Sequence, residues 1–234
     1  MKKLLLLFVF TSFVTFAQKN PILNNNEVFN GDPMLMLSEN NQIKGSKYIL
    51  TEWNEGYLIL NDSIFSYQNH ILYDQLDGAL ILKAKDGSGF KVKDYSVTGF
   101  ILGEIDSNDR YYFSKVTSSS FENQENKTKY YEVVNNSKKT NYLIKDTQKY
   151  IFDPNRSKGA GTNNNFAREY KEKTTYYIKT KTGKYVKSKL RKKDILKNLN
   201  DKTSELKAFI SSKKINFNKE HDVVKALEYY HSIK

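Results

Sequence analysis

Residues 79–95, ALILKAKDGSGFKVKDY, hold two apolar runs on either side of a glycine-flanked serine. Apolar residues recur at every second position in both runs, which is the period of a half-buried β-strand. With residues 87–89 as a three-residue loop and Gly89 in the left-handed conformation, one face of the hairpin becomes apolar. Loops of two or four residues would mix lysines with apolar side chains, so burial selects this register. The other face then carries two cross-strand lysine pairs, Lys83 with Lys93 and Lys85 with Lys91.

This four-lysine face has two interpretations. It is a surface that binds anions, or it is an exposed strand pair whose lysines discourage edge-to-edge association. Like charges directly opposite one another are destabilising, so acidic neighbours or a ligand must offset them. A phosphate-binding P-loop is not indicated, because the further glycines and the Lys-Ser/Thr pair that opens its helix are missing.

Segments with the same period recur from Tyr48 to Val186, between turn signals such as Asp77-Gly78. They are rich in aromatic and β-branched residues, which suit a pleated, half-buried surface. Examples are TEWNEGYLIL, VTGFILGE, RYYFSKV, TNYLIKD, KYIFD and EKTTYYIKT. Many short strands joined by tight turns predict a mainly β, α+β fold, built as an antiparallel sandwich or a partly open barrel. Residues 153–167, rich in Gly and Asn, predict a long loop between two of the strands.

After Lys187 the apolar period changes from two to about 3.6 residues, which predicts helices. The expected helices carry the apolar residues Leu190, Ile195, Leu196 and Leu199; Leu206, Phe209 and Ile210; and Val223, Val224, Leu227 and Tyr230. Asn218 is the expected cap of the third helix. The chain is thus divided into a β-rich domain at 18–187 and a basic helical segment at 188–234 that packs on it.

The first 17 residues, MKKLLLLFVFTSFVTFA, are typical of a signal peptide, with two lysines before a short apolar run and small residues at its end. The apolar run is too short for a stable membrane span, and no transmembrane segment is expected in the mature chain. No cysteine occurs in the 234 residues, so disulfides and a lipid-bearing cysteine are excluded. We expect a protein exported to the periplasm or beyond, including a peripheral position on the envelope.

Positive charge is concentrated at the end of the chain. Residues 18–167 hold 17 basic and 18 acidic side chains, whereas residues 168–234 hold 19 and 8. This asymmetry favours an anionic partner, namely a polysaccharide, a lipid surface or an envelope protein, with nucleic acid disfavoured. The alternative is a solvated lysine face that only maintains solubility. The candidate binding residues are Lys83, Lys85, Lys91 and Lys93 of the hairpin and Lys189, Arg191, Lys192 and Lys193 of the tail.

No recognisable catalytic set accompanies these lysines. The three histidines, His70, His221 and His231, do not form a helix-borne metal motif. Two S-x-x-K segments follow the Lys-Thr-Gly at 181–183, whereas in penicillin-recognising enzymes S-x-x-K comes first. Carboxylates show no spacing that marks an acid and a base, although a glycosidase pair assembles from distant strands. The sequence predicts no catalytic residue, no metal site and no cofactor.

Several segments carry a resemblance: GYLILND, HILYDQLDGALILKAKDG, VTGFILGE and the tail KAFISSKKINFNKEHDVVKALEYY. On these the chain resembles a loosely defined set of exported, β-rich proteins of Gram-negative bacteria with no known activity. The resemblance implies export and a β-rich body with a helical tail, and it assigns no residue a role.

Three functions are compatible with the sequence. The first is a non-enzymatic module that binds an anionic envelope partner through its basic tail, with the lysine hairpin as a lesser candidate. The second is an exported hydrolase that acts on envelope polymers through paired carboxylates. The third is a structural component of the envelope.

Overall fold

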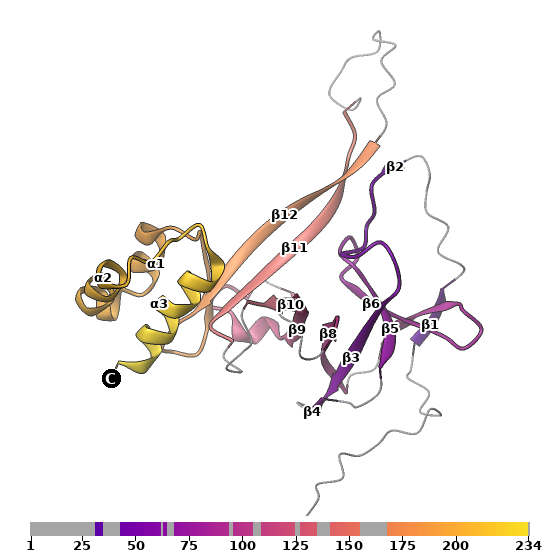
Figure 1. Ribbon diagram of the computed structural model, residues 1–234, viewed down its shortest axis with the longest axis horizontal. Coiled ribbons are helices and arrows are strands. Elements are labelled where there is room, and N and C mark those ends of the chain that lie inside the picture. The colour runs from indigo at the N-terminus through magenta and orange to yellow at the C-terminus, as the bar shows by residue number, and fades with distance from the viewer. Residues whose placement is uncertain are drawn as a thin grey trace, which may run out of the picture.

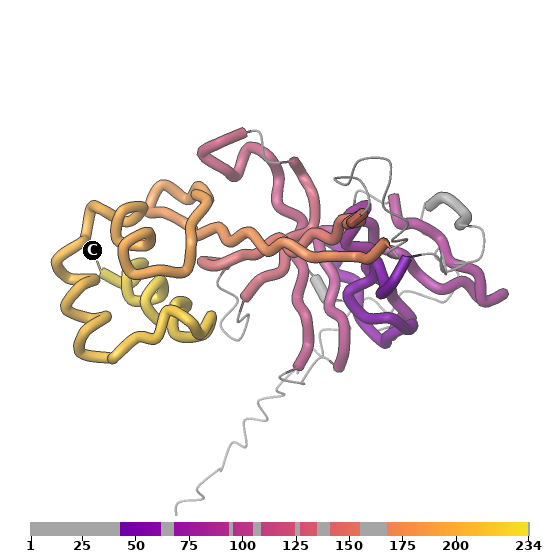
Figure 2. The backbone as a smooth tube through the Cα atoms, turned by 90° about the horizontal axis from the view of Figure 1, so that it is seen from above, coloured from indigo at the N-terminus to yellow at the C-terminus, as the bar shows by residue number. Residues whose placement is uncertain are grey.

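The computed structural model describes residues 31–34, 43–61, 63–64, 68–93, 96–104, 109–124, 127–134, 141–154 and 168–233, with only the backbone at 31–34 and 63–64. The predicted signal peptide lies outside the described residues, as does most of the predicted loop at 153–167. Figures 1 and 2 show an elongated molecule with helices at one end, N-terminal strands at the other, and a long two-stranded ribbon between them.

The described strands form one 13-stranded sheet, in the order β1-β7-β6-β5-β3-β8-β9-β10-β11-β12-β13, with β2 beside β12 and β4 beside β3. Every pairing is antiparallel except that of β2 with β12. The strands are β1 (Gly31–Met34), β2 (Ile43–Lys44), β3 (Asn54–Leu60), β4 (Ser63–Ile64), β5 (Asn69–Asp74), β6 (Ala79–Lys83), β7 (Gly89–Val92), β8 (Val97–Leu102), β9 (Tyr111–Val116), β10 (Lys129–Val133), β11 (Leu143–Phe152), β12 (Arg168–Lys179) and β13 (Tyr185–Ser188). The prediction of a mainly β fold is confirmed.

The sheet is open but curls on itself around an apolar interior. Tyr73 of β5 lies 4.8 Å from Phe113 of β9 between ring centroids and 6.4 Å from Tyr130 of β10, although β3 and β8 separate these strands in the sheet. The backbone N–H of Lys149 in β11 also donates to the carbonyl of Gln75, which follows β5. Of the two predicted architectures, the curled sheet therefore corresponds to the partly open barrel.

The predicted register of the hairpin at 79–95 is wrong, because each cross-strand partner lies four residues from the predicted one. Lys83 lies opposite Gly89 and Ile81 opposite Lys91, so no cross-strand lysine pair forms. The left-handed residue is Gly87, with φ +85°, and Asp86 accepts hydrogen bonds from the N–H and hydroxyl of Ser88. This turn is favoured because the Asp86 side chain caps it and Gly87 readily adopts the left-handed conformation that it needs.

The two faces of the hairpin are both apolar in part. Phe90 and Val92 pack on the barrel interior, as predicted. The opposite face is not a lysine face, because Ile81 is fully buried there against Leu72 and Tyr48. Lys83, Lys85 and Lys93 are exposed and Lys91 is half-buried, and the four side chains do not share a patch in the predicted register.

The segments TNYLIKD and KYIFD, predicted as separate strands, form the single strand β11. It pairs with β12 without interruption from Leu143 opposite Ile178 to Phe152 opposite Glu169. The polar residues Thr147 and Gln148 between the two segments continue the strand, because a partner lies opposite them along the whole ribbon. The C-terminal helices lie at the end of the ribbon where β11 begins and β12 ends (Figure 1).

The C-terminal helices are α1 (Lys192–Asn198), α2 (Thr203–Ser212) and α3 (Glu220–Ser232), with the short 3₁₀ turn η3 (Asn200–Lys202) between α1 and α2; another 3₁₀ turn, η1 (Ser118–Ser120), follows β9. Their buried stripes pack on Val134, Leu143 and Ile178 of the sheet. Leu190 precedes α1 instead of belonging to it, and the residue before α3 is Lys219, without a side-chain cap, so the Asn218 cap is wrong. None of the helices in the described residues is long and apolar enough to cross a membrane.

Candidate anion-binding site

A basic groove lies where β13 ends and the chain turns into α1. It has a volume of about 640 Å³ and is bordered by β12 and β13 on one side and by α1 on the other. The charged residues that line it are Lys173, Lys187, Lys189, Arg191, Asp194 and Lys197. We call this site the edge groove. It brings together side chains from three consecutive elements.

Buried contacts hold α1 at the edge groove. Ile195 and Leu199 are fully buried against the sheet and the other helices. The side-chain amide of Asn198 donates to the carbonyl of Lys187, at 3.3 Å, and ties the end of α1 to β13. The apolar side of α1 is thereby committed to the core. Its basic residues are left on the solvent side.

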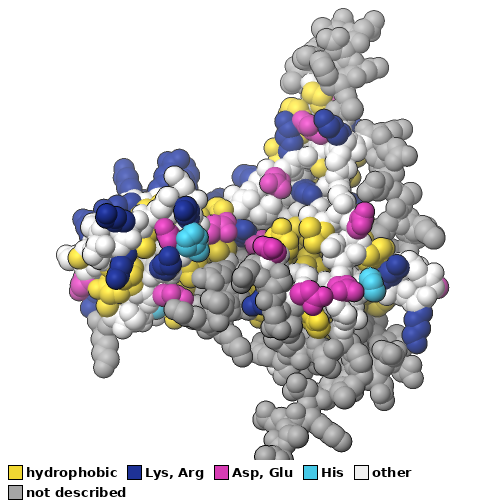
Figure 3. All heavy atoms as spheres, viewed as in Figure 1, with side chains coloured by type: hydrophobic (Ala, Val, Ile, Leu, Met, Phe, Trp, Pro, Cys, Tyr) yellow, Lys and Arg dark blue, Asp and Glu magenta, His cyan; other side chains and the backbone are white. Residues whose placement is uncertain are grey.

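The edge groove has a strong excess of positive charge. Five cationic side chains line it, against the single carboxylate of Asp194. Within the described residues, none of these five cations belongs to a salt bridge. Figure 3 shows Lys and Arg side chains gathered over the helical end of the molecule. Uncompensated charges of one sign in a concave site raise the local concentration of anions.

The predicted tail residues lie in or beside this groove. Lys189 and Arg191 line it, and Lys192 and Lys193 are exposed in the first turn of α1. Sequence reasoning missed Lys173, Lys187 and Lys197. Lys187 ends a predicted strand and Lys173 lies in the strand before it. The turn predicted at Lys181-Thr182-Gly183 pairs these two strands and could have placed the two lysines near each other.

The predicted hairpin residues are not brought to the edge groove. Lys93 borders a separate cleft of about 910 Å³ at the barrel rim, with Lys115, Lys127 and Lys129. Lys129 is paired there with Asp146, at 2.5 Å, and Lys115 lies over the ring of Tyr130. Part of the positive charge of this cleft is thus balanced. The edge groove is the stronger candidate for an anion.

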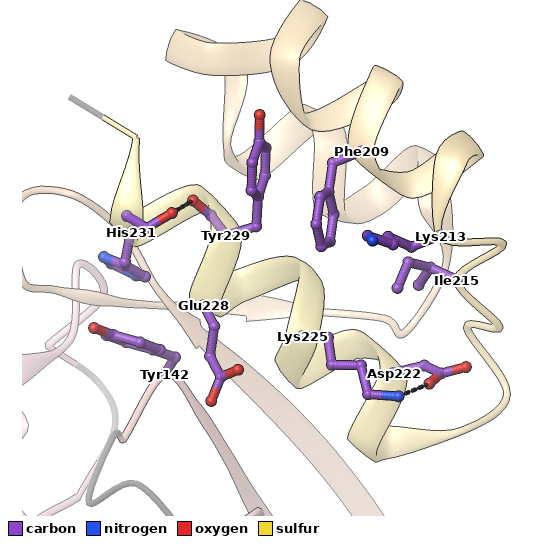
Figure 4. A pocket seen from close by; sticks show the side chains of 10 residues that line it. Tyr142, Phe209, Lys213, Ile215, Asp222, Lys225, Glu228, Tyr229 and His231 are labelled. Atoms are coloured by element: carbon purple, nitrogen blue, oxygen red, sulfur yellow. Dashed lines mark hydrogen bonds and ion pairs between the residues drawn. The ribbon is translucent and has the colours of Figure 1, made fainter.

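A third cavity, of about 620 Å³, lies between α2 and α3 (Figure 4). The rings of Tyr142 and His231 are stacked at 4.0 Å on one side, and those of Phe209 and Tyr229 at 4.0 Å on the other. This cavity combines aromatic walls with two carboxylates, Asp222 and Glu228, and so invites a test of the hydrolase alternative.

Asp222 does not have the properties of a general acid. Hydrogen bonds from the side chain of Lys225 and the N–H of Asn216 lower the pKa of Asp222, whereas a general acid needs a raised pKa. Six residues separate Asp222 from Glu228 on α3, which is about 9 Å along the helix. Figure 4 shows Glu228 directed toward Tyr142 and Asp222 at the other end of the helix. Asp222 therefore stabilises the start of α3, where it accepts the Asn216 N–H and pairs with Lys225.

We expect His231 to make the stability of the fold depend on pH. Burial lowers its pKa below 6.5, and its Nε2 lies 2.9 Å from the carbonyl of Lys179. The folded state therefore holds a neutral ring, and its contribution to stability is complete above pH 6.5 and is lost as pH falls through the lowered pKa. We expect the melting temperature to fall between pH 7 and pH 5, and His231→Phe, which keeps a ring against Tyr142, to reduce this slope. Identical pH profiles for both proteins would contradict this assignment.

A partly buried charged cluster joins α3 to the sheet. The Lys145 ammonium lies 3.0 Å from Glu132 and 3.1 Å from Glu220, and the Tyr176 hydroxyl donates to Glu220 at 2.7 Å. Burial raises the pKa of Glu132, and burial together with the Glu220 hydrogen bond raises the pKa of Tyr176 to about 12. Burial alone would lower the pKa of Lys145, but the two carboxylates raise it. Both carboxylates pair with the same lysine, so the cluster anchors α3 to the sheet.

Within the described residues, no group of three or more His, Asp or Glu side chains is arranged to hold a metal ion. Comparisons of the chain with protein-family models, with curated proteins and with solved structures found no match.

Proposed function

We propose that this chain is an exported, non-enzymatic module that binds an anionic partner of the bacterial envelope through the edge groove. The observation that carries the proposal is the convergence of five cations on one groove with a single carboxylate, Asp194. Export rests on the signal-like residues 1–17. The net positive charge of residues 168–234 attracts the same class of partner at longer range.

The chemistry of the site favours a ligand that carries several negative charges. Each exposed lysine contributes little by itself, because water and salt screen its charge. A partner with several phosphate, sulfate or carboxylate groups engages several cations at once, and the small contributions add. Binding of this kind weakens steeply as the salt concentration rises.

The proposal is tested by measuring the affinity of the protein for a sulfated or uronate polysaccharide and for anionic vesicles at low and high salt. The double variant Lys189→Glu with Arg191→Glu reverses two groove charges, and we expect it to weaken binding about tenfold or more at low salt. The matched control is Lys207→Glu with Lys214→Glu, which makes the same change in net charge at exposed positions outside the groove. The control is expected to retain affinity within about threefold.

Two outcomes would contradict the proposal. One is affinity that does not change with salt, or no binding at low salt. The other is an equal loss in both double variants, which would show that total charge matters and the groove does not. Lys83→Glu with Lys93→Glu, in the same assay, measures the lesser contribution predicted for the hairpin.

A further inference from the structure

The outer edge of β12 is open over the middle of the strand. On one side β11 pairs with β12 along the whole ribbon. On the other side β2 covers Arg168 and Glu169, and β13 covers β12 from Tyr176 to Lys179. Within the described part of the chain, residues 170–175 have no strand partner on this side. The gap corresponds to about 20 Å of extended chain, and Figure 1 shows it between β2 and the helices.

Backbone hydrogen-bonding groups point out of this open edge. The Thr180 N–H donates to Lys184 across the β12–β13 turn, whereas the Lys179 N–H donates to Tyr142 on the β11 side. Because alternate residues of an antiparallel strand direct both backbone groups to the same side, the even-numbered residues face outward. Glu172 and Thr174 therefore present their N–H and C=O groups to the gap, whereas the N–H of Tyr170 belongs to the parallel pairing with β2. These groups are spaced to pair with another extended chain.

The edge groove lies along the same gap. Lys173, Thr174 and Thr175 line the groove together with Ser188, where β13 ends. A strand added beside residues 170–175 would thus continue the line of β13 and end at Lys189 and Arg191. The open edge and the excess cations belong to one site.

The two faces of the open edge differ in charge. Lys171 and Lys173 lie on one face, and Glu172 and Thr174 on the other, because neighbouring strand residues alternate. Lys187 lies opposite Tyr177 and therefore on the same face as the two lysines. Glu169 pairs with Lys171, at 3.0 Å, so Lys173 and Lys187 carry most of the uncompensated charge. An added strand with acidic residues at alternate positions matches this pattern.

The same charges disfavour pairing between two copies of this chain. Two such edges would bring lysines directly opposite lysines, which is destabilising. A polysaccharide or a lipid headgroup has no regular ladder of backbone amides, so it would use the charges and leave the edge groups of Glu172 and Thr174 unpaired. An acidic peptide uses both features.

We propose that the partner in the edge groove is an acidic, extended peptide segment that adds to β12 as a further strand, with its carboxylates on Lys173, Lys187 and the cations beyond them. The inference rests on the proposed function, because it specifies the anion that the groove binds. Main-chain hydrogen bonds supply part of the affinity, and the cations select the acidic face.

The test uses the full chain and synthetic peptides of about eight residues, which are long enough to span the gap and reach beyond it. The first peptide alternates glutamate with threonine. The second has the same composition with its glutamates in one block, and the third and fourth are the alternating peptide N-methylated on one or the other alternate set of amides. Removing the amides that face β12 is expected to weaken binding about tenfold or more, whereas methylation of the outward set changes affinity less than about threefold.

Amide hydrogen exchange gives an independent readout. The alternating peptide is expected to slow exchange at Glu172 and Thr174, whereas a sulfated polysaccharide leaves these two amides unprotected. Lys173→Glu is expected to weaken binding of the alternating peptide about fivefold or more, although the backbone groups of the edge are unchanged.

The outcomes separate this inference from the proposed function. Salt-dependent binding of polysaccharide, with no difference among the four peptides and no slowed exchange, would overturn strand addition and leave the anion-binding groove in place. Binding of no anion at all would overturn both.

Discussion

Replacing Lys145 by Met is expected to lower the free energy of unfolding by about 3 kcal/mol or more at neutral pH. Lys145 is only 18% exposed and Glu132 only 14%, so the substitution leaves a carboxylate in the interior without its counter-charge. Glu220 loses its lysine partner as well, and with it one of the links from α3 to the sheet. Chemical denaturation followed by tryptophan fluorescence and circular dichroism measures the change.

The loss of unfolding free energy in the Lys145→Met protein is expected to grow as pH rises. Burial already raises the pKa of Glu132, and loss of the neighbouring ammonium raises it further. The folded variant then keeps a proton that the unfolded chain releases above about pH 4.3, so its stability falls as pH rises through this range. We expect the difference from wild type to be larger at pH 7 than at pH 5.

Lys225→Met is the matched control for this effect. Lys225 also pairs with a carboxylate, Asp222 at 2.9 Å, but its side chain is 57% exposed. A surface pair of this kind contributes about 1 kcal/mol or less. Equal losses in the two variants would show that the charged cluster below α3 is not the anchor described above.

Gly99→Ala is expected to destabilise the barrel by about 3 kcal/mol or more, or to prevent folding. Gly99 lies in β8 between β3 and β9, and a Cβ atom there would overlap the backbone carbonyl oxygen of Phe113. A backbone group on the neighbouring strand cannot move without parting the two strands. Gly56 of β3 has the same relation to the carbonyl of Ile101. The amount of soluble protein and its unfolding free energy measure the effect.

Gly89→Ala is a graded control within the same sheet. A Cβ atom at this position would lie 3.2 Å from a side-chain carbon of Ile81 and 3.4 Å from the ring of Trp53. Side chains move more easily than a strand, so we expect a loss of about 1 kcal/mol. If Gly99→Ala were as mild as Gly89→Ala, the close approach of β8 and β9 would not be a feature of the folded protein.

Local pattern was sufficient to predict most of the strands after Tyr48 and the three C-terminal helices. The alternation in GYLILND and VTGFILGE corresponds to β3 and β8, and the apolar spacing after Lys187 corresponds to the three helices. The inward direction of Phe90 and Val92 also followed from alternation. Burial of one face acts on each segment by itself, so a single sequence reveals it.

Register and long-range assembly were harder to predict. Shifting the cross-strand pairing by four residues keeps the same side chains on each face, so alternation does not distinguish the two registers, and the turn at Asp86 and Gly87 decides. The edge groove joins Lys173 to Arg191 through the β12–β13 hairpin and the position of α1. Its open edge depends on where β2 docks, which no local period indicates.

The central claim is that anions bind at the edge groove, and amide chemical shifts of the labelled protein locate binding most directly. On adding a short polyanion at low salt, the account predicts the largest shift changes at residues 173–176, 187–191 and 197, with loss of these changes at high salt. Changes that centre on the hairpin at 83–93, or that spread evenly over every lysine-bearing surface, would contradict it.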